Sequence, residues 1–380
     1  MTIPFSLPTI GQEEEAAVLE VLRSGWITTG KKCSEFEQLF VDRVGSKHAL
    51  ALTSATAALH LALAVHNIGP GDEVVTPSMN WCSTPNMVRL LGAKPVFVDV
   101  FPDTLNIDPE DLQRVMTSRT KAVVPVHFAG RAYDVDAVLE VMKDYSAVLI
   151  DDAAHAIGTV YKGQEVGALA DLSSFSFHPM KNITTGEGGM LTYDDDALHE
   201  KLKLLKFHGV NRDAFSRYRS NDLPHYDVQF PGYKYNLTDI QAALGVVQMR
   251  QLDAFNERRS TLAHRYSELL SGLPLLLPPL EERSDCVHAW HLYVVRLQKD
   301  IALTREDVMI KLKDSGVSTG LHFLPVHQTT AFSDLTSHLP VTEFVGSQIF
   351  SLPLFPGLTF EQQDVIVKAI HDIIGRGSKK

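Results

Sequence analysis

The sequence predicts an α/β fold in which helices flank a mostly parallel central sheet. Short apolar segments alternate with helical segments through the first two-thirds of the chain. Several of the apolar segments, such as Ala122–Val126 and Ala147–Ile150, are continuous runs, which suit strands buried on both faces. At 380 residues, the chain is also long enough for a large domain and a smaller one.

The expected elements alternate between strand and helix, and such crossovers usually join parallel neighbours. The predicted strands are His48–Leu52, Glu73–Thr76, Pro95–Asp99, Ala122–Val126, Ala147–Ile150, Ser173–Phe177 and Gly189–Tyr193. The predicted helices of this part are Ala55–Val65, Thr84–Leu91, Pro109–Met116, Val135–Lys143 and Asp196–Phe207. One helix start is especially clear, because Pro109 follows Asp108 as an N1 proline follows a helix cap.

A second, smaller α+β domain is predicted after a long helical pattern from Asp239 to about Leu270. Its expected elements are one strand and two helices, at Leu292–Leu297, Thr304–Ser315 and Glu361–Ile374. We therefore expect a large domain over 1–249 and a small domain over 250–380, and leave open that the N-terminal segment packs on the small one. Before the long helix, Asn211–Tyr235 is aromatic and polar without periodicity, which is typical of a functional or mobile loop.

Composition excludes several classes of partner. The net charge is −11 and no cluster of basic residues stands out, so neither nucleic acid nor an anionic membrane is expected to bind. Cys33, Cys82 and Cys286 have neither metal-ligand nor disulfide-framework spacing, and we expect no metal. No signal-peptide pattern and no apolar stretch of about 20 residues is visible, so we expect a cytoplasmic protein.

One lysine stands in an unusual place for a charged residue. Lys181 follows the apolar segment Ser173–Phe177 and precedes the glycine-rich turn Gly186–Gly189. Lysines are nearly always exposed, but these neighbours predict a buried position where the backbone turns tightly beside a ligand. Desolvation lowers the pKa of a lysine and makes its neutral amine available as a nucleophile and base.

A pair of acids closes an earlier predicted strand, where ligands of parallel sheets gather. Asp151 and Asp152 follow Ala147–Ile150, and two adjacent buried acids are costly unless a cation pairs with one of them. Side chains alternate along a strand, so only one acid can face the ligand, and we choose Asp152. A lysine and a carboxylate suit pyridoxal phosphate, because the lysine forms a Schiff base and the carboxylate keeps the pyridine nitrogen protonated. His155, three residues on, is either a ring contact or a structural histidine.

Three further segments complete the candidate cofactor site, and each has a plainer alternative. Thr53–Ala57 opens a helix whose free N–H groups and dipole would hold a phosphate, although an ordinary Ser-capped helix has the same pattern. Trp81 would stack on a cofactor ring, or else be a core tryptophan. The hydroxyl of Ser176 would hydrogen-bond a phosphate.

Together these segments resemble the DegT/StrS-type nucleotide-sugar aminotransferases, which belong to the fold-type I pyridoxal-phosphate enzymes. The resemblance runs over nearly the full length, and its motifs are Gly25–Gly30, Ser54–Ala58, Gly71–Pro77, Asp152–His155, Ser176–Gly189, Lys206–Gly209, Pro231–Asp239 and Ser351–Pro356. Sugar dehydratases of this superfamily have histidine in place of the lysine, so Lys181 favours transamination.

The resemblance implies a role for each site residue. Lys181 would form the Schiff base, Asp152 would pair with the pyridine nitrogen, Trp81 would stack on the ring, and His155 would lie near the phenolic oxygen. The phosphate would be bound by Ala55, Thr56, Ser176 and Asn236. Asn236 would reach the site of the neighbouring subunit, so the active unit would be a homodimer with shared sites. The candidates for the substrate pocket, or else for ordinary packing and turns, are Trp26, Thr28, His322, Phe323 and His327.

Within the family, the resemblance is greatest to the branch that makes UDP-4-amino-4-deoxy-L-arabinose for lipid A modification, in lipopolysaccharide biosynthesis. The shared segments are Val126–Gly130, Phe177–His178 before Lys181–Asn182, Lys206–Gly209, Val287–Leu292 and Thr319–Phe323, and the departures are Pro179–Met180 and Asn80. The resemblance implies transfer of an amino group from L-glutamate to C4 of a nucleotide-linked 4-keto sugar, with a UDP-4-keto-pentose as first choice. Pyridoxamine phosphate would be the intermediate form of the cofactor, and 2-oxoglutarate would be released.

Three other functions stay open at this point. The first is amination of another nucleotide-linked sugar, a 4-keto-6-deoxyhexose, because such relatives share most of these motifs. The second is a pyridoxamine-dependent sugar dehydratase, and the third is a non-catalytic regulator that binds pyridoxal phosphate.

Overall fold

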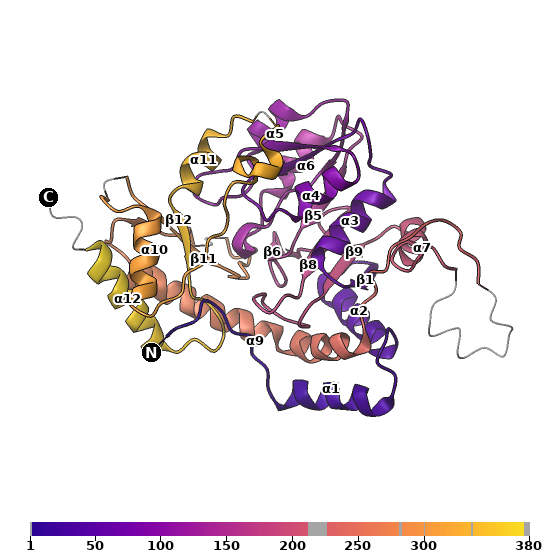
Figure 1. The fold of residues 1–380 in the computed structure, drawn as a ribbon, viewed down its shortest axis with the longest axis horizontal. Helices are drawn as coiled ribbons and strands as arrows, with labels where there is room; N and C mark the ends of the chain where they lie inside the picture. Colours follow the sequence, from indigo (N-terminus) through magenta and orange to yellow (C-terminus); the bar gives the residue numbers. More distant parts are fainter. Residues whose placement is uncertain (1, 212–225, 281–282, 300, 336, 376–380) are drawn as a thin grey trace.

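The computed structural model describes residues 2–211, 226–280, 283–299, 301–335 and 337–375, and its centre is a seven-stranded sheet (Figure 1). The strand order is β1-β9-β8-β5-β4-β2-β3. The strands are β1 (His48–Leu52), β2 (Glu73–Pro77), β3 (Lys94–Val98), β4 (Thr120–Val123), β5 (Val148–Asp152), β8 (Leu172–Ser176) and β9 (Gly189–Tyr193). Within this sheet, only β9 runs against its neighbours β1 and β8, so the predicted α/β fold with a mostly parallel sheet is confirmed.

Helices cover both faces of this sheet. The hydrophobic core on one face is formed with α3 (Ala55–Val65), α4 (Ser83–Leu90) and α7 (Asp196–Leu205). On the other face, α2 (Lys31–Val44) and the first half of α9 (Asp239–Leu269) pack at one end, and α5 (Pro109–Val115) and α6 (Val135–Met142) pack at the other. Side chains placed before the first turn fix these helix starts, because Ser54, Asp108, Asp134 and Asp195 each accept a backbone N–H bond there.

A smaller unit occupies the C-terminal end of the molecule, at the left of Figure 1. Its antiparallel sheet contains β10 (Leu275–Leu276), β11 (Tyr293–Leu297) and β12 (Ile349–Leu352). Its helices are α10 (Arg305–Asp314), α11 (Pro340–Gly346) and α12 (Phe360–Ile374). Short elements complete the chain, namely the hairpin β6 (Val160–Tyr161) and β7 (Gln164–Glu165) and the 3-10 turns Phe128–Gly130, Val326–Gln328 and Thr330–Phe332.

The long helix α9 joins the two units. Its second half contributes Leu262, Ala263 and Tyr266 to the C-terminal core, so the boundary between 1–249 and 250–380 falls inside one helix and is kept as a proposal. Ile3, from the N-terminal segment, lies in the same core, and its N–H donates to the carbonyl of Gly316 at 2.7 Å. In the described part of the chain, no helix combines the length and the hydropathy that a membrane span needs.

Some elements differ from the sequence-based expectation. The predicted strand Ala122–Val126 ends early, at Val123, because Pro125 has no N–H for a sheet ladder. The helices α1 (Gln12–Ser24) and α2 were not predicted, although Gly25 and Gly45 end them in the left-handed region, a signal that the sequence carries. Of the predicted loop Asn211–Tyr235, residues 212–225 lie outside the described residues.

One buried carboxylate joins two of the sequence motifs. Asp239 follows the cap of α9, yet its Oδ1 accepts the N–H of Gly30 at 2.8 Å and of Cys33 at 3.0 Å, and its Oδ2 accepts that of Lys32 at 3.2 Å. The N-terminus of α2 is thus capped by a residue more than 200 positions away. The carboxylate of Asp239 therefore holds segments 25–30 and 231–239 together through the N–H of Gly30.

We predict that Asp239→Ala lowers the free energy of unfolding by about 2–4 kcal/mol, because two buried N–H groups and one half-buried N–H group lose a charged acceptor. Asp239→Asn keeps one acceptor oxygen and should lose less. Urea unfolding of the cofactor-free protein, followed by circular dichroism, measures both values. A loss below about 0.5 kcal/mol for the alanine variant, the range of ordinary surface changes, would contradict this account of the cap.

Candidate active site

Lys181 lies in a tight loop between β8 and β9. Its N–H donates to the carbonyl of His178 at 2.8 Å. The loop is anchored by the next residue, because the side-chain amide of Asn182 donates to Asn256 Oδ1 at 2.7 Å and to the carbonyl of Ala289 at 2.8 Å. Burial lowers the pKa of Lys181 to about 8, and the negative charge of Asp152 acts in the opposite direction. A large fraction of this lysine is therefore a neutral amine near pH 8.

The two adjacent acids of β5 lie in different surroundings, as the alternation of a strand requires. Asp151 is fully buried and accepts hydrogen bonds from the hydroxyls of Tyr133, at 2.6 Å, and Ser173, at 3.2 Å. Asp152 is 5% exposed, and its carboxylate lies close enough to Lys181 to raise the pKa of that amine. Burial raises the pKa of Asp152 itself, against the hydrogen bonds from Ala154 and Asn80. The carboxylate chosen from the sequence is thus the one beside the lysine.

Histidines surround this pair in neutral form. Burial, followed by the charge of Lys181, lowers the pKa of His155 and His291 well below the usual range and that of His322 to about 4. The rings of His155 and His291 lie 4.4 Å apart, and Phe323 stacks on His155 with a centroid distance of 5.8 Å. Uncharged imidazoles next to a lysine avoid repulsion, and they leave Asp152 as the anion acting on the amine.

The start of α3 forms a cradle beside β8 and β9. Gly189 lies so close to it that a Cβ there would approach the backbone atoms of Ser54 and Ala55 to within 2.5 Å. The hydroxyl of Ser174 donates to the carbonyl of Ala55 at 3.0 Å and holds the turn on the sheet. In the described chain, the N–H groups of Ala55 and Thr56 have no protein acceptor. A phosphate fits these donors, since helix N-termini bind anions.

The predicted ring and phosphate contacts lie around the same strand ends. Ser176 closes β8, five residues before the lysine, and accepts the N–H of His178 at 3.5 Å. Trp81 follows β2 and is 62% exposed, with its ring centroid 6.0 Å from that of Phe323. An indole that stays exposed beside a buried charged pair offers an open face to a flat ring. The core alternative for Trp81 therefore does not hold.

Three of the predicted substrate residues, His322, Phe323 and His327, lie in the segment between α10 and α11. His322 and Phe323 lie beside His155, as described above, and His322 Nδ1 is 2.9 Å from Ser351 Oγ. His327 is held by other partners, since its Nδ1 lies 2.7 Å from Ser78 Oγ and its Nε2 lies 3.4 Å from Glu343 Oε1. Both ring nitrogens of His327 thus contact protein side chains. Its role in substrate binding stays a prediction.

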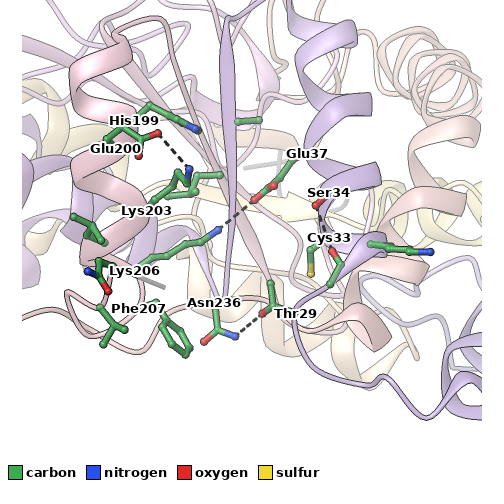
Figure 2. A pocket seen from close by; sticks show the side chains of 17 residues that line it. Thr29, Cys33, Ser34, Glu37, His199, Glu200, Lys203, Lys206, Phe207 and Asn236 are labelled. Atoms are coloured by element: carbon green, nitrogen blue, oxygen red, sulfur yellow. Dashed lines mark hydrogen bonds and ion pairs between the residues drawn. The ribbon is translucent and has the colours of Figure 1, made fainter. Parts of the chain in front are cut away.

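The predicted substrate residues Trp26 and Thr28 lie next to the capped start of α2, together with the predicted phosphate residue Asn236. The indole N–H of Trp26 donates to the carbonyl of Thr29, the carbonyl of Thr28 accepts the N–H of Asp239, and Asn236 donates to Thr29 Oγ1 at 2.5 Å. Figure 2 shows Thr29 and Asn236 at the edge of a pocket of about 530 Å³ between α2 and α7. Among the cofactor residues predicted from the sequence, only Asn236 lines this pocket.

Two residues of the site were missed in the sequence. The first is His291, in the segment Val287–Leu292, which was noted only for its resemblance. Buried Arg259 holds this segment by donating to the carbonyls of His291, at 3.3 Å, and Leu354, at 2.8 Å. The second is Asn80. Asn80 donates to Asp152 Oδ2 at 3.3 Å. The only sequence signal for Asn80 was its departure from the family pattern before Trp81.

The fold and the site define the class of fold-type I pyridoxal-phosphate enzymes. A family model described as the DegT/DnrJ/EryC1/StrS aminotransferase family matches residues 8–371. The chain belongs to this family and is an enzyme, a sugar aminotransferase.

Solved structures agree with this assignment over whole chains. The candidate sugar aminotransferase Spr1654 from Streptococcus pneumoniae, in its PLP form, is 32% identical with a TM-score of 0.92, and the match covers 99% of each chain. The same protein in its PMP form is 33% identical, with a TM-score of 0.91 and 99% of this chain and 98% of that chain covered. Helicobacter pylori PseC, an aminotransferase involved in the biosynthesis of pseudoaminic acid, is 31% identical, with a TM-score of 0.91, and 99% of this chain and 100% of that chain are covered.

We predict that Asp152→Asn lowers the pKa of Lys181 below about 8, because the substitution removes the negative charge that favours the ammonium form. The pH dependence of acylation of Lys181 in the cofactor-free protein, followed by peptide mass spectrometry, measures this shift. Exposed Lys313 in the same digest corrects for the reagent's own pH dependence. An unchanged or higher midpoint for Lys181 would show that Asp152 does not act on this amine.

Proposed function

We propose that this enzyme transfers the amino group of L-glutamate to C4 of a nucleotide-linked 4-keto sugar. The observation that carries the proposal is the desolvated Lys181, with Asp152 beside it and the phosphate cradle of α3 nearby. Membership of a sugar-aminotransferase family supports the reaction class, and the retained lysine favours transfer of an amine over removal of oxygen.

The site fits pyridoxal 5'-phosphate, which when bound supplies an electron sink for the carbanion formed beside the transferred nitrogen. His155 Nδ1 is buried and has no partner in the described chain, so it is free for a polar atom of a ligand. Asp152, as an anion, would hold the pyridine N–H, Trp81 would cover the ring, and Ala55, Thr56 and Ser176 would bind the phosphate. Neighbours solved in PLP and PMP forms support the same cofactor and its amine form.

Lys181 also has the properties of the proton carrier. In its neutral form, Nζ can take the proton from Cα of the amino donor, and it can return a proton at the cofactor carbon. A pKa of about 8 lets both forms be populated near neutral to slightly alkaline pH. Buried Phe323 stacks on His155 and shields this side of the site from water.

The sugar is proposed from motif similarity alone. The segments Val126–Gly130, Val287–Leu292 and Thr319–Phe323 resemble the branch that forms UDP-4-amino-4-deoxy-L-arabinose, so a UDP-4-keto-pentose is our first choice, with a role in lipid A modification. Another nucleotide-linked 4-keto-6-deoxyhexose is the second candidate. Cytoplasmic location also stays a prediction.

We further propose a homodimer whose sites are shared. Asn236 and Thr29 line the pocket of Figure 2, which contains neither Lys181 nor Asp152, and Trp26 and Thr28 lie next to Thr29. If the pocket faces a second copy, these residues would complete the site of the partner subunit, and Asn236 would reach its phosphate.

The proposed reaction is tested with Lys181→Ala and a panel of nucleotide-linked 4-keto sugars. We expect the wild type to release 2-oxoglutarate from glutamate with one of these sugars, and the variant to lose at least about 10²–10⁴-fold of that rate. Borohydride should fix the cofactor on the Lys181 peptide of the wild type only, and exposed Lys313→Ala serves as the control. A deoxygenated product without glutamate turnover would identify a dehydratase, and a bound cofactor that glutamate does not change would identify a regulator.

The shared site is tested by co-expressing Lys181→Ala chains with Asn236→Ala chains. A mixed dimer would contain one site with both residues intact, so random pairing should restore about one quarter of wild-type activity. Each variant alone should be nearly inactive. If the mixture is no more active than the two variants measured separately, Asn236 serves its own chain or has no role in the site.

A further inference from the structure

We propose that Asn80 is a positioning residue that orients both Asp152 and Trp81 in the cofactor site. The inference rests on the proposed function, because it concerns the ring-facing side of that same site. Asn80 lies three residues beyond the end of β2 and is only 3% exposed. Its side chain is therefore fixed inside the protein, at the carboxyl end of the sheet.

The two ends of this amide have separate tasks. The oxygen of Asn80 accepts the backbone N–H of Trp81 at 2.6 Å, and the nitrogen donates to Asp152 Oδ2 at 3.3 Å. A backbone N–H can only donate, so the amide oxygen must face Trp81 and the NH₂ group must face the carboxylate. The orientation of Asn80 is thus set by chemistry, and the donor end points at the candidate ring partner.

The donor end acts on the charge of Asp152. Asp152 Oδ2 also accepts the hydroxyl of Thr84 at 3.4 Å, and Asp152 Oδ1 accepts the N–H of Ala154 at 3.3 Å. The titratable groups that act on the carboxylate are Lys181 and His127. Hydrogen bonds to an ionised carboxylate favour the ionised form and oppose the effect of burial. Asn80 therefore helps to keep Asp152 an anion, the state that can hold a pyridine N–H.

The acceptor end acts on the aromatic residue. Trp81 is largely exposed, and Phe323 is its one ring neighbour among the described residues. An indole with so little packing depends on its backbone for its position. The bond from its N–H to Asn80 fixes that peptide relative to Asp152, so that one amide sets the distance between the stacking residue and the carboxylate.

Two substitutions separate these tasks. Asn80→Asp keeps an oxygen for the N–H of Trp81 but places a second carboxylate against Asp152, which raises the pKa of Asp152. Asn80→Ala removes both bonds. Asn86→Ala is the matched control, because Asn86 lies in α4 and takes no part in the hydrogen bonds of Asp152 described above.

The readouts are the dissociation constant of pyridoxal phosphate, titrated into cofactor-free protein by absorbance, and the pH profile of kcat/KM. For Asn80→Asp we expect the acid limb of kcat/KM to move up by about one pH unit. We also expect the dissociation constant to rise about tenfold at pH 6.5 and to return toward the wild-type value as the pH rises. Asn80→Ala should show the same upward shift, and Asn86→Ala should show none.

The inference would be overturned if, in Asn80→Asp, the dissociation constant of pyridoxal phosphate and kcat/KM depended on pH as they do in the wild type. If that variant does not fold, as judged by its unfolding temperature, Asn80→Ala decides, and an equal loss of affinity at every pH would reduce Asn80 to a packing residue. The inference fails separately from the proposed function. If the wild type is active and the pH profiles of Asn80→Asp are unchanged, only the role of Asn80 is disproved. If the wild type shows no glutamate-dependent transfer, the proposed reaction is disproved.

Discussion

The site depends on one electrostatic constraint: the side chains of Lys181 and Asp152 are both buried away from solvent, close to each other. Burial alone would neutralise both groups, since it lowers the pKa of the amine and raises that of the carboxylate. Each charge opposes this effect on the other. The amine thus remains close to the point of balance between its two forms, and the carboxylate has a cation nearby before any ligand arrives. The neutral histidines around the pair leave that balance undisturbed.

The fold serves this constraint by bringing strand ends together. Asp152 ends β5, Lys181 follows β8, and the phosphate cradle follows β1, so a single edge of the sheet holds groups that are far apart in the chain. The C-terminal unit closes the edge from outside. Buried Arg259 ties the segment around His291 to α9, and Phe323 comes to rest on His155. Both units therefore contribute to one water-poor space.

The sequence was sufficient for the seven strands of the central sheet, for most helices and for the burial of Lys181 beside Asp152, whereas β6, β7, β10 and β12 were not predicted. Lys181 and Asp152 were found because a charge at the end of an apolar run contradicts its neighbours. Asn80 and His291 were missed because an amide and a histidine are ordinary in any loop, and only contacts across the fold reveal their place. The grouping of Trp26 with Asn236 was equally hidden, since it depends on Asp239 capping a helix about 200 residues earlier. Long-range hydrogen bonds leave no periodic pattern in a sequence.

The close approach of Gly189 to the turn at Ser54 and Ala55 has a consequence for the pairing of β9. This strand runs against both of its neighbours, and Gly189 lies opposite Leu52 on one side and Ser176 on the other. A slip of one residue would bring the side chain of Met190 to the place where even a methyl group does not fit, and it would exchange the two faces of the strand. The close packing of the Ser54–Ala55 turn against Gly189 therefore also selects the alignment of β9, so an error in its register would displace the phosphate cradle.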